Sequence, residues 1–156
     1  MASLSQIVVL RCGGTPFGVP IERVREIVMV PAITPVPESG ACVRGIINLR
    51  GRILPVLDLG LRLGLPPGPR EGSGRILVVE QESQQLVGLL VDEASEVLRV
   101  PETLLSPPPE LAGGPLGASV RGVARLDERL VLLLDLAMLV SPDVVGSMTT
   151  GRDAPA

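Results

Sequence analysis

Hydrophobic side chains in this chain occur in short runs, rich in Val, Ile and Leu, that are separated by polar, glycine-containing and proline-containing segments. Short β-branched runs bounded by turn residues predict strands rather than helices. The runs are 4–11, 17–21, 45–50, 52–59, 75–80, 86–91, 96–100, 120–126 and 129–134. Because no long helical pattern alternates with them, the sequence predicts an all-β protein of the barrel or sandwich type.

The segments between the runs predict turns, loops and a few short helices. Gly14-Thr15-Pro16 is expected to reverse the first hairpin, and Asp127-Glu128 the last. Residues 22–30 predict a helical turn that passes into a strand, 31–40 an extended connector, and 60–65 a brief helix or turn. We expect loops at 66–74 and 101–117, a turn at 83–85, a short helix at 135–140 capped by Asp135, and a disordered tail at 141–156.

Two stretches of the sequence resemble each other. GIINLRGRILPVLDLGLRL and GVARLDERLVLLLDLAMLV share a glycine, a strand, a charged turn, an apolar strand ending in Leu-Asp-Leu and a short apolar segment. A repeated supersecondary unit of this kind would be explained by two small barrels related by internal repetition.

Composition removes several classes of function. The 156 residues contain no histidine, the commonest general base and metal ligand, and Cys12 and Cys42 lack metal-ligand spacing. A net charge of −3 argues against a nucleic-acid partner. Phosphate-binding glycine loops are absent, and the apolar runs are shorter than the roughly 20 residues of a membrane span. We therefore expect a cytoplasmic protein that is not an enzyme and has no metal or other cofactor.

The segment around the first repeated stretch contains the candidate functional residues. Gly51 lies between two arginines and permits the positive φ of a tight reversal. Arg50 is either a solvated arginine near a turn or a contact residue, and Asn48 either a contact or a polar group satisfying neighbouring backbone. Gly45 predicts a bulge or the close approach of another backbone. Apolar side chains occupy both faces of these strands, which predicts contact with a second layer or a partner.

With these residues described, the chain closely resembles the CheW family, the coupling proteins of bacterial chemosensory arrays. The resemblance lies in VRGIINLRGRILPVLDL at 43–59, preceded by ITPVP at 33–37, and continues through GLLVD at 88–92, EVLRV at 96–100, Gly122-Val123 and LLLD at 132–135. It covers the chain from about Ile7 to Val140. Glu128 departs from it, since it occupies a position where the family often has glycine.

The resemblance implies one CheW-like domain over 1–140, made of two intertwined five-stranded barrels. Each barrel is similar to a Src-homology-3 fold, and the pair shares a hydrophobic core; sequence order centres the first on 15–65 and the second on 75–135. It also implies a scaffold without catalytic activity. Such a scaffold joins the cytoplasmic hairpin tip of chemoreceptors to the regulatory domain of the histidine kinase CheA, and it meets the membrane only indirectly, through the receptors.

The same resemblance implies two binding surfaces. A groove between the barrels would bind the receptor, with Arg50 at its rim, and the predicted receptor-binding residues are Arg50, Asn48, Gly45, Ile46 and Val36. Val87, Leu89, Val91 and Val97 are predicted to bind the kinase through apolar surface, although each could instead be a core residue. An alternative function is a CheW-like regulatory module that competes for receptor or kinase or serves a chemosensory pathway other than chemotaxis.

Overall fold

A computed structural model of the chain describes residues 4–37, 39–66, 73–108, 114–126 and 128–140. The tail at 141–156, most of the loop at 66–74 and Asp127 of the last predicted turn lie outside these residues. The strands are β1 (Leu4–Cys12), β2 (Thr15–Pro20), β3 (Val24–Met29), β4 (Val43–Leu49), β5 (Arg52–Asp58), β6 (Arg75–Glu80), β7 (Leu86–Val91), β8 (Glu93–Pro101), β9 (Leu105–Ser106), β10 (Val120–Leu126) and β11 (Arg129–Leu134). The helices are short: η1 (Ile21–Arg23), α1 (Leu59–Arg62), η2 (Glu102–Leu104), α2 (Pro115–Ser119) and α3 (Leu136–Leu139).

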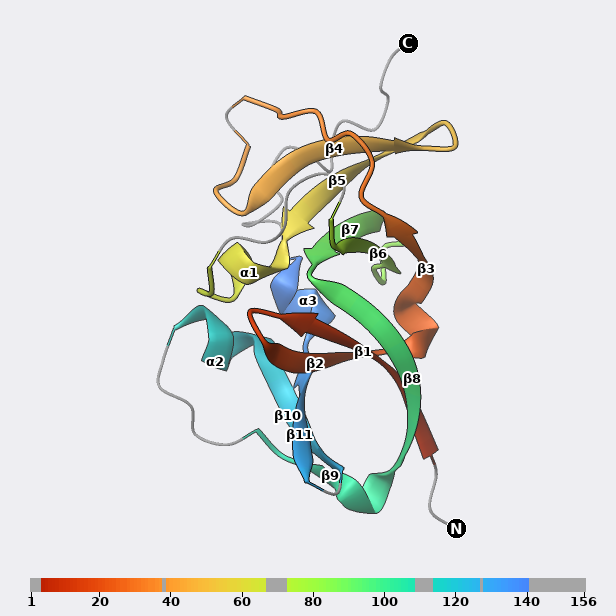
Figure 1. Ribbon diagram of the computed structural model, residues 1–156, viewed down its shortest axis with the longest axis vertical. Helices are drawn as coiled ribbons and strands as arrows, with labels where there is room; N and C mark the ends of the chain where they lie inside the picture. The colour runs from red at the N-terminus through yellow and green to blue at the C-terminus, as the bar shows by residue number, and fades with distance from the viewer. Residues whose placement is uncertain (1–3, 38, 67–72, 109–113, 127, 141–156) are drawn as a thin grey trace.

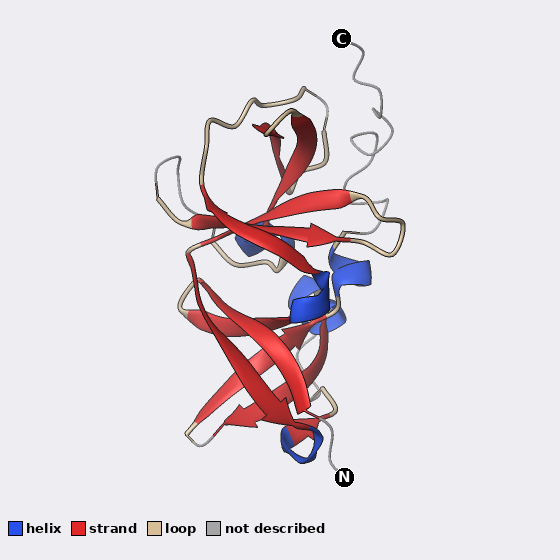
Figure 2. Cartoon of the chain, turned by 90° about the vertical axis from the view of Figure 1, so that its right-hand side faces the viewer, coloured by secondary structure: helices blue, strands red, loops and turns tan. Residues whose placement is uncertain are grey.

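The strands form two sheets, each curled into a small barrel, stacked along the long axis of the molecule (Figures 1 and 2). We call the five-stranded sheet, ordered β3-β6-β7-β5-β4, the first subdomain. The six-stranded sheet, ordered β8-β1-β2-β11-β10-β9, is the second subdomain. The predicted all-β fold of two Src-homology-3-like subdomains is confirmed, although the two-residue β9 adds a sixth strand to the second sheet.

Sequence order does not divide the subdomains. The β1–β2 hairpin belongs to the second subdomain, and the β6–β7 hairpin, placed by sequence order in the second, belongs to the first. The chain therefore crosses between the two sheets twice, from β2 to β3 and from β7 to β8. The predicted centres at 15–65 and 75–135 are wrong for these hairpins, because each hairpin pairs with strands from the other half of the chain.

Within the described ranges, three clusters of buried side chains make up the core. The largest contains residues of both sheets, among them Phe17 and Leu134 of the second subdomain and Leu57 and Leu89 of the first. Smaller clusters fill the first subdomain around Leu54 and Ile76 and the second around Val100 and Val131. Each sheet thus packs its two faces against separate apolar layers, as the apolar residues on both strand faces predict.

The repeated stretches adopt the same local structure. In each, a register shift precedes a strand hairpin, at Gly45 in one and Gly122 in the other. An aspartate then caps the following helix: Asp58 Oδ1 accepts a hydrogen bond from Leu61 N at 3.2 Å, and Asp135 Oδ1 from Met138 N at 3.3 Å. The backbone N–H groups of Asp58 and Asp135 donate to the carbonyls of Cys42 and Ser119, both at 2.8 Å. The predicted internal repetition is confirmed, and so is the cap at Asp135.

Local predictions differ from the structure at three places. The first hairpin turns at Gly13-Gly14, both with positive φ, because Cys12 pairs with Thr15. Strand β8 begins at Glu93, three residues before its apolar run. The segment predicted as a loop at 101–117 contains η2, β9 and the first turn of α2. Among the described residues, no helix has the length and apolar character needed to cross a membrane.

Candidate functional site

The β4–β5 hairpin turns through two residues, Arg50 and Gly51, with φ values of 52° and 89°. Leu49 pairs with Arg52 across the turn, so the loop has the length and the positive φ angles of a type I′ turn. Gly51 adopts this φ without a side-chain clash, and its predicted turn role is confirmed. Arg50 occupies a region that L-residues rarely adopt, which holds its side chain at the hairpin tip.

Asn48 contacts this turn. Its Oδ1 accepts a hydrogen bond from the Gly51 backbone N–H at 2.8 Å. The alternative reading of Asn48, in which it satisfies neighbouring backbone, is therefore confirmed. Asn48 is exposed, so its side-chain Nδ2 is still accessible to another molecule.

Arg50 forms an ion pair with Glu26 of β3. Because β3 and β4 are the two edge strands of the first subdomain, this pair joins the hairpin tip to the opposite edge of the sheet. The Arg50 side chain is 68% exposed and that of Glu26 31%. Such an exposed pair contributes little to stability. The pair uses Nη2 of Arg50, so the other N–H donors of this exposed guanidinium can face solvent. Arg50 is thus accessible, as predicted, and it is oriented by Glu26, which the sequence analysis did not single out.

Gly45 and Ile46 bind the connector instead of facing solvent. The N–H of Ile46 donates to Thr34 O, and the N–H of Thr34 to Ile46 O, both at 2.9 Å. A Cβ built on Gly45, whose φ is 148°, would lie 2.1 Å from Thr34 O. The predicted bulge and close backbone approach at Gly45 are both confirmed. Gly45 is buried, so any effect of this residue on receptor binding would act through the position of the connector. Ile46 and Val36 are half-buried.

The predicted kinase surface is mostly core. Val87, Leu89 and Val91 each have 0% exposed surface and belong to the cluster shared by the two subdomains. These three cannot touch a partner, so the kinase-binding prediction is wrong for them and the core alternative holds. They are buried because β7 lies between β6 and β5, with both faces covered. Val97 differs, because β8 is an edge strand, and its side chain is 49% exposed.

Val97 and Ile27 are two exposed apolar residues at the rim of the shared core. Ile27, on β3, is 40% exposed and pairs with Leu77, while Val97 pairs with Val8, and both partners are buried in the shared cluster. Strands β3 and β8 are the two that follow the chain crossings, and they lie on the same side of the molecule in Figure 1. Their sequences also correspond, REIVMVP at 25–31 with SEVLRVP at 95–101. Ile27 was not among the predicted binding residues, although the correspondence of 25–31 with 95–101 aligns it with Val97.

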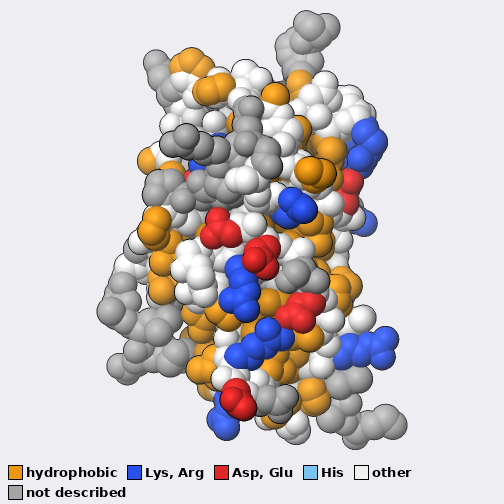
Figure 3. All heavy atoms as spheres, in the orientation of Figure 1, with side chains coloured by type: hydrophobic (Ala, Val, Ile, Leu, Met, Phe, Trp, Pro, Cys, Tyr) orange, Lys and Arg blue, Asp and Glu red, His pale blue; other side chains and the backbone are white. Residues whose placement is uncertain are grey.

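Further exposed apolar residues lie toward the two ends of the molecule. Met29 and Ile53 of the first subdomain are 68% and 52% exposed, and Leu104 and Leu130 of the second 39% and 57%. A hollow of about 410 Å³ in the second subdomain is lined by Leu98, Arg99, Leu126, Glu128 and Arg129. Arg129 pairs with Glu96 at 2.7 Å beside it. On the face seen in Figure 3, hydrophobic side chains are visible between arginines and carboxylates.

The described residues offer little for catalysis. No group of three or more His, Cys, Asp or Glu side chains among them could hold a metal ion. Burial, together with the charges of Asp92 and Asp58, raises the pKa of Cys12 to about 12, so its thiol stays protonated at neutral pH. Burial also raises the pKa of Cys42. Neither thiol is therefore an activated nucleophile.

Comparison with known proteins identifies the family of this chain. Residues 6–143 match the model of the CheW-like domain. This chain belongs to the CheW-like family. It is 36% identical over 136 residues to the probable chemotaxis protein CheW of Rhizobium etli, with 87% of each chain covered. It is 36% identical to the chemotaxis protein CheW of Rhizobium meliloti, with 84% of each chain covered.

A solved structure shows the same fold. The scaffolding protein TtCheW from Thermoanaerobacter tengcongensis is similar with a TM-score of 0.80 and 35% sequence identity, over 88% of this chain and 93% of that one. The protein PilI of Pseudomonas aeruginosa is 37% identical over 105 residues, which cover 65% of this chain and 58% of PilI.

Proposed function

We propose that this chain is a non-enzymatic chemotaxis adaptor that couples chemoreceptors to a CheA-type histidine kinase in the cytoplasm. Its family membership supports the adaptor role. The observation that carries the proposal is apolar surface left uncovered at the rim of the shared core and toward both ends of the molecule. Scattered exposed apolar residues are ordinary, but here they occur on edge strands and hairpins, where a second protein can approach.

The receptor would bind across β3, β8 and the β4–β5 turn. Ile27 and Val97 would pack against the apolar stripe of the receptor's helical hairpin, a recognition mode common for amphipathic helices. Arg50, held by Glu26 at the turn, would donate hydrogen bonds to a carboxylate or carbonyl of the receptor. Asn48 would support this turn, and Gly45, Ile46 and Val36 would position the connector behind it.

The kinase regulatory domain would bind the apolar residues toward the ends of the barrels. Met29 and Ile53 would provide this surface on the first subdomain, and Leu104 and Leu130 on the second. These residues replace Val87, Leu89 and Val91, which are buried. Val97, which the sequence analysis predicted to bind the kinase, is assigned here to the receptor surface, because it lies, like Ile27, at the rim of the shared core.

Receptor binding is tested with Arg50→Glu and Val97→Asp in a pull-down on receptor-containing membranes. Both substitutions should reduce the bound fraction at least about tenfold, because each puts a carboxylate into the contact. Arg125→Glu is the matched control, since it reverses an exposed arginine of β10, outside β3, β8 and the β4–β5 turn. Thermal melting of each variant separates lost binding from lost folding. Binding that survives both substitutions would contradict the proposed surface.

Kinase coupling is tested with purified kinase, receptor and this protein. An adaptor should raise kinase autophosphorylation, whereas the alternative, a regulatory module that competes for receptor or kinase, should lower it. Leu130→Glu and Ile53→Glu should weaken binding to the kinase while receptor binding is kept. If both variants stimulate the kinase as the unmodified protein does, the assignment of the barrel ends is wrong.

A further inference from the structure

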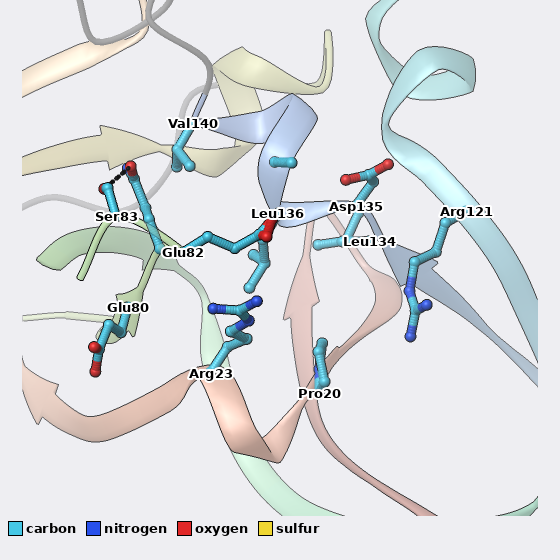
Figure 4. A pocket seen from close by; sticks show the side chains of 12 residues that line it. Pro20, Arg23, Glu80, Glu82, Ser83, Arg121, Leu134, Asp135, Leu136 and Val140 are labelled. Atoms are coloured by element: carbon cyan, nitrogen blue, oxygen red, sulfur yellow. Dashed lines mark hydrogen bonds between the residues drawn. The ribbon is translucent and has the colours of Figure 1, made fainter. Parts of the chain in front are cut away.

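A cavity of about 400 Å³ lies at the boundary between the subdomains (Figure 4). It is bounded by the end of β2 with η1, by the β6–β7 turn and by α3. Its lining includes Arg23, Gln81, Arg121, Leu136 and Val140. None of the residues predicted to bind receptor or kinase lines it.

The internal repetition gives this cavity a counterpart near α1 and the β1–β2 turn, and there the chain itself fills the space. After α1 the segment 63–66 folds back: the N–H of Leu65 donates to Gly60 O at 2.7 Å. The Leu65 side chain packs against the shared core and lies beside Gly13, where a built Cβ would be 3.6 Å from Leu65 Cδ1. The first residue of α1, Leu59, is consequently 0% exposed, whereas the equivalent Leu136 of α3 is only half-buried.

The sequence from Ala137 to Pro142 differs from that of the first closure at three positions. The carbonyl of Pro66 lies over Gly60, 2.3 Å from where a Cβ would be, and the equivalent position is Ala137, which has a Cβ. Gly64 has a φ of 78°, and the equivalent residue is Ser141. Leu65 donates its backbone N–H, and the equivalent residue is Pro142, which has none. The three sequence features of the first closure are therefore not repeated at the equivalent positions.

One polar group in the cavity is left without a partner. Gln81 Oε1 accepts a hydrogen bond from Ser83 Oγ at 3.4 Å, but Gln81 Nε2 is buried with no hydrogen-bond partner among the described residues. A buried donor of this kind is stabilised by an acceptor such as a peptide carbonyl. The lining contains two arginines, Arg23 and Arg121, and three carboxylates, Glu80, Glu82 and Asp135. Glu80 pairs with Arg25 outside the lining, so the cavity carries no excess positive charge and favours a neutral peptide over a free anion.

We propose that this cavity binds a peptide segment of a partner protein, with a leucine-sized aliphatic side chain placed as Leu65 is in the counterpart. A backbone carbonyl of the same segment would accept a hydrogen bond from Gln81 Nε2. The side chain would cover Leu136, which is only half-buried, whereas its equivalent Leu59 is 0% exposed. This inference does not depend on the receptor and kinase surfaces proposed above, because it uses none of their residues.

The test uses the full chain, isotope-labelled for NMR, and a capped synthetic peptide with the sequence of residues 61–66, LRLGLP. We expect saturable shifts of the Gln81 side-chain amide and of the Ala137 and Val140 methyl resonances. A peptide with aspartate in place of Leu65 should bind at least about tenfold more weakly, because the apolar contact is lost. Ala137→Glu, at an exposed position, should weaken the binding of LRLGLP to a similar degree while the melting temperature is kept.

A second variant tests the closure directly. Ala137→Gly, Ser141→Gly and Pro142→Leu together restore the three features of the 63–66 segment, and the combined variant should melt at a higher temperature and no longer bind the peptide. Absence of saturable shifts, or equal binding of both peptides, would overturn the proposal. So would nuclear Overhauser contacts between Ala137 and the methyl groups of Val144 or Val145, which would show that the chain's own tail occupies the cavity. Cavity shifts that depend on protein concentration alone would overturn it in favour of a second copy.

Discussion

The two subdomains contain the same helix-capping aspartate and bulge glycine, but these residues are buried to different extents. Asp58 caps α1, has 0% exposed surface and pairs with Arg44 at 3.0 Å, whereas Asp135 caps α3 from a half-buried position. Gly45 lies against the backbone of the connector, whereas Gly122 is less tightly enclosed. The first subdomain therefore closes its repeat with its own chain, whereas the described residues of the second, which end at Val140, leave part of the equivalent surface open. Repetition of a sequence motif predicts the same local geometry, but it does not predict the same burial.

The largest expected difference concerns the two bulge glycines. In Gly45→Ala the new Cβ would lie 2.1 Å from Thr34 O, and the residue keeps a φ of 148° that L-residues avoid. In Gly122→Ala the Cβ would lie 3.0 Å from Ser106 O, a contact that small shifts can relieve. We expect losses of unfolding free energy of about 3 kcal/mol or more for Gly45→Ala and about 1 kcal/mol for Gly122→Ala, measured by urea denaturation. Equal losses would mean that the connector can shift away from the new Cβ of Gly45→Ala at little cost in free energy.

The second largest difference in stability is expected between substitutions of the two capping aspartates. Asp58→Ala removes a helix cap and leaves Arg44 without its buried ionic partner, which we expect to cost about 3 kcal/mol. Asp135→Ala removes a cap alone and should cost about 1 kcal/mol. Asp58→Asn serves as the control, since it can keep the cap while it removes the charge. If both alanine variants unfold at the same urea concentration, the ion pair adds nothing to the cap.

The raised pKa values of the two cysteines predict how the stability of the fold depends on alkaline pH. The pKa of Cys12 is raised to about 12 in the folded chain, and an ordinary thiol has a value of about 9. The unfolded chain thus loses its proton first. This contribution to stability is complete below pH 9 and falls between pH 9 and 12, by up to about 1.4 kcal/mol per pH unit. The chain has no Tyr or Lys to mask the effect.

Urea midpoints between pH 8 and 11 measure this slope. Cys12→Ala should flatten it, whereas Cys42→Ala should change it less, because Cys42 is only half-buried and the charge of Arg62 opposes the rise of its pKa. A slope that persists unchanged in the Cys12 variant would show that another group is responsible.

Features that depend on neighbouring residues could be predicted from the sequence. The strands, the turn at Gly51, the bulge at Gly45 and the cap at Asp135 all follow from local spacing and backbone preference. The exchange of hairpins between the subdomains could not, because β5 pairs with β7 and β11 with β2 through parallel contacts between distant segments. The burial of Val87, Leu89 and Val91 follows from that exchange. Apolar residues on a central strand and on an edge strand have the same pattern, so only the topology separates them from Val97.

The smallest expected effects concern the exposed ion pairs. Glu26–Arg50 and Glu96–Arg129 should each show a coupling below about 1 kcal/mol in double-mutant cycles, and both should weaken with added salt. Arg50 differs from Arg129 in its backbone, because its φ is positive. Arg50→Gly removes one exposed ion pair but also relieves a backbone strain of about 1 kcal/mol, so the variant should be as stable as the unmodified chain or slightly more stable.

Arg129→Gly has no strain to relieve, because Arg129 lies in strand β11, and it should lose about 1 kcal/mol. Urea denaturation and receptor pull-down on the two glycine variants then separate stability from binding. If Arg50→Gly keeps its stability and loses the receptor, the arginine serves recognition at a position where folding alone would favour glycine. If it unfolds more easily than Arg129→Gly, the Glu26–Arg50 pair closes the first barrel, and Arg50 is primarily a structural residue.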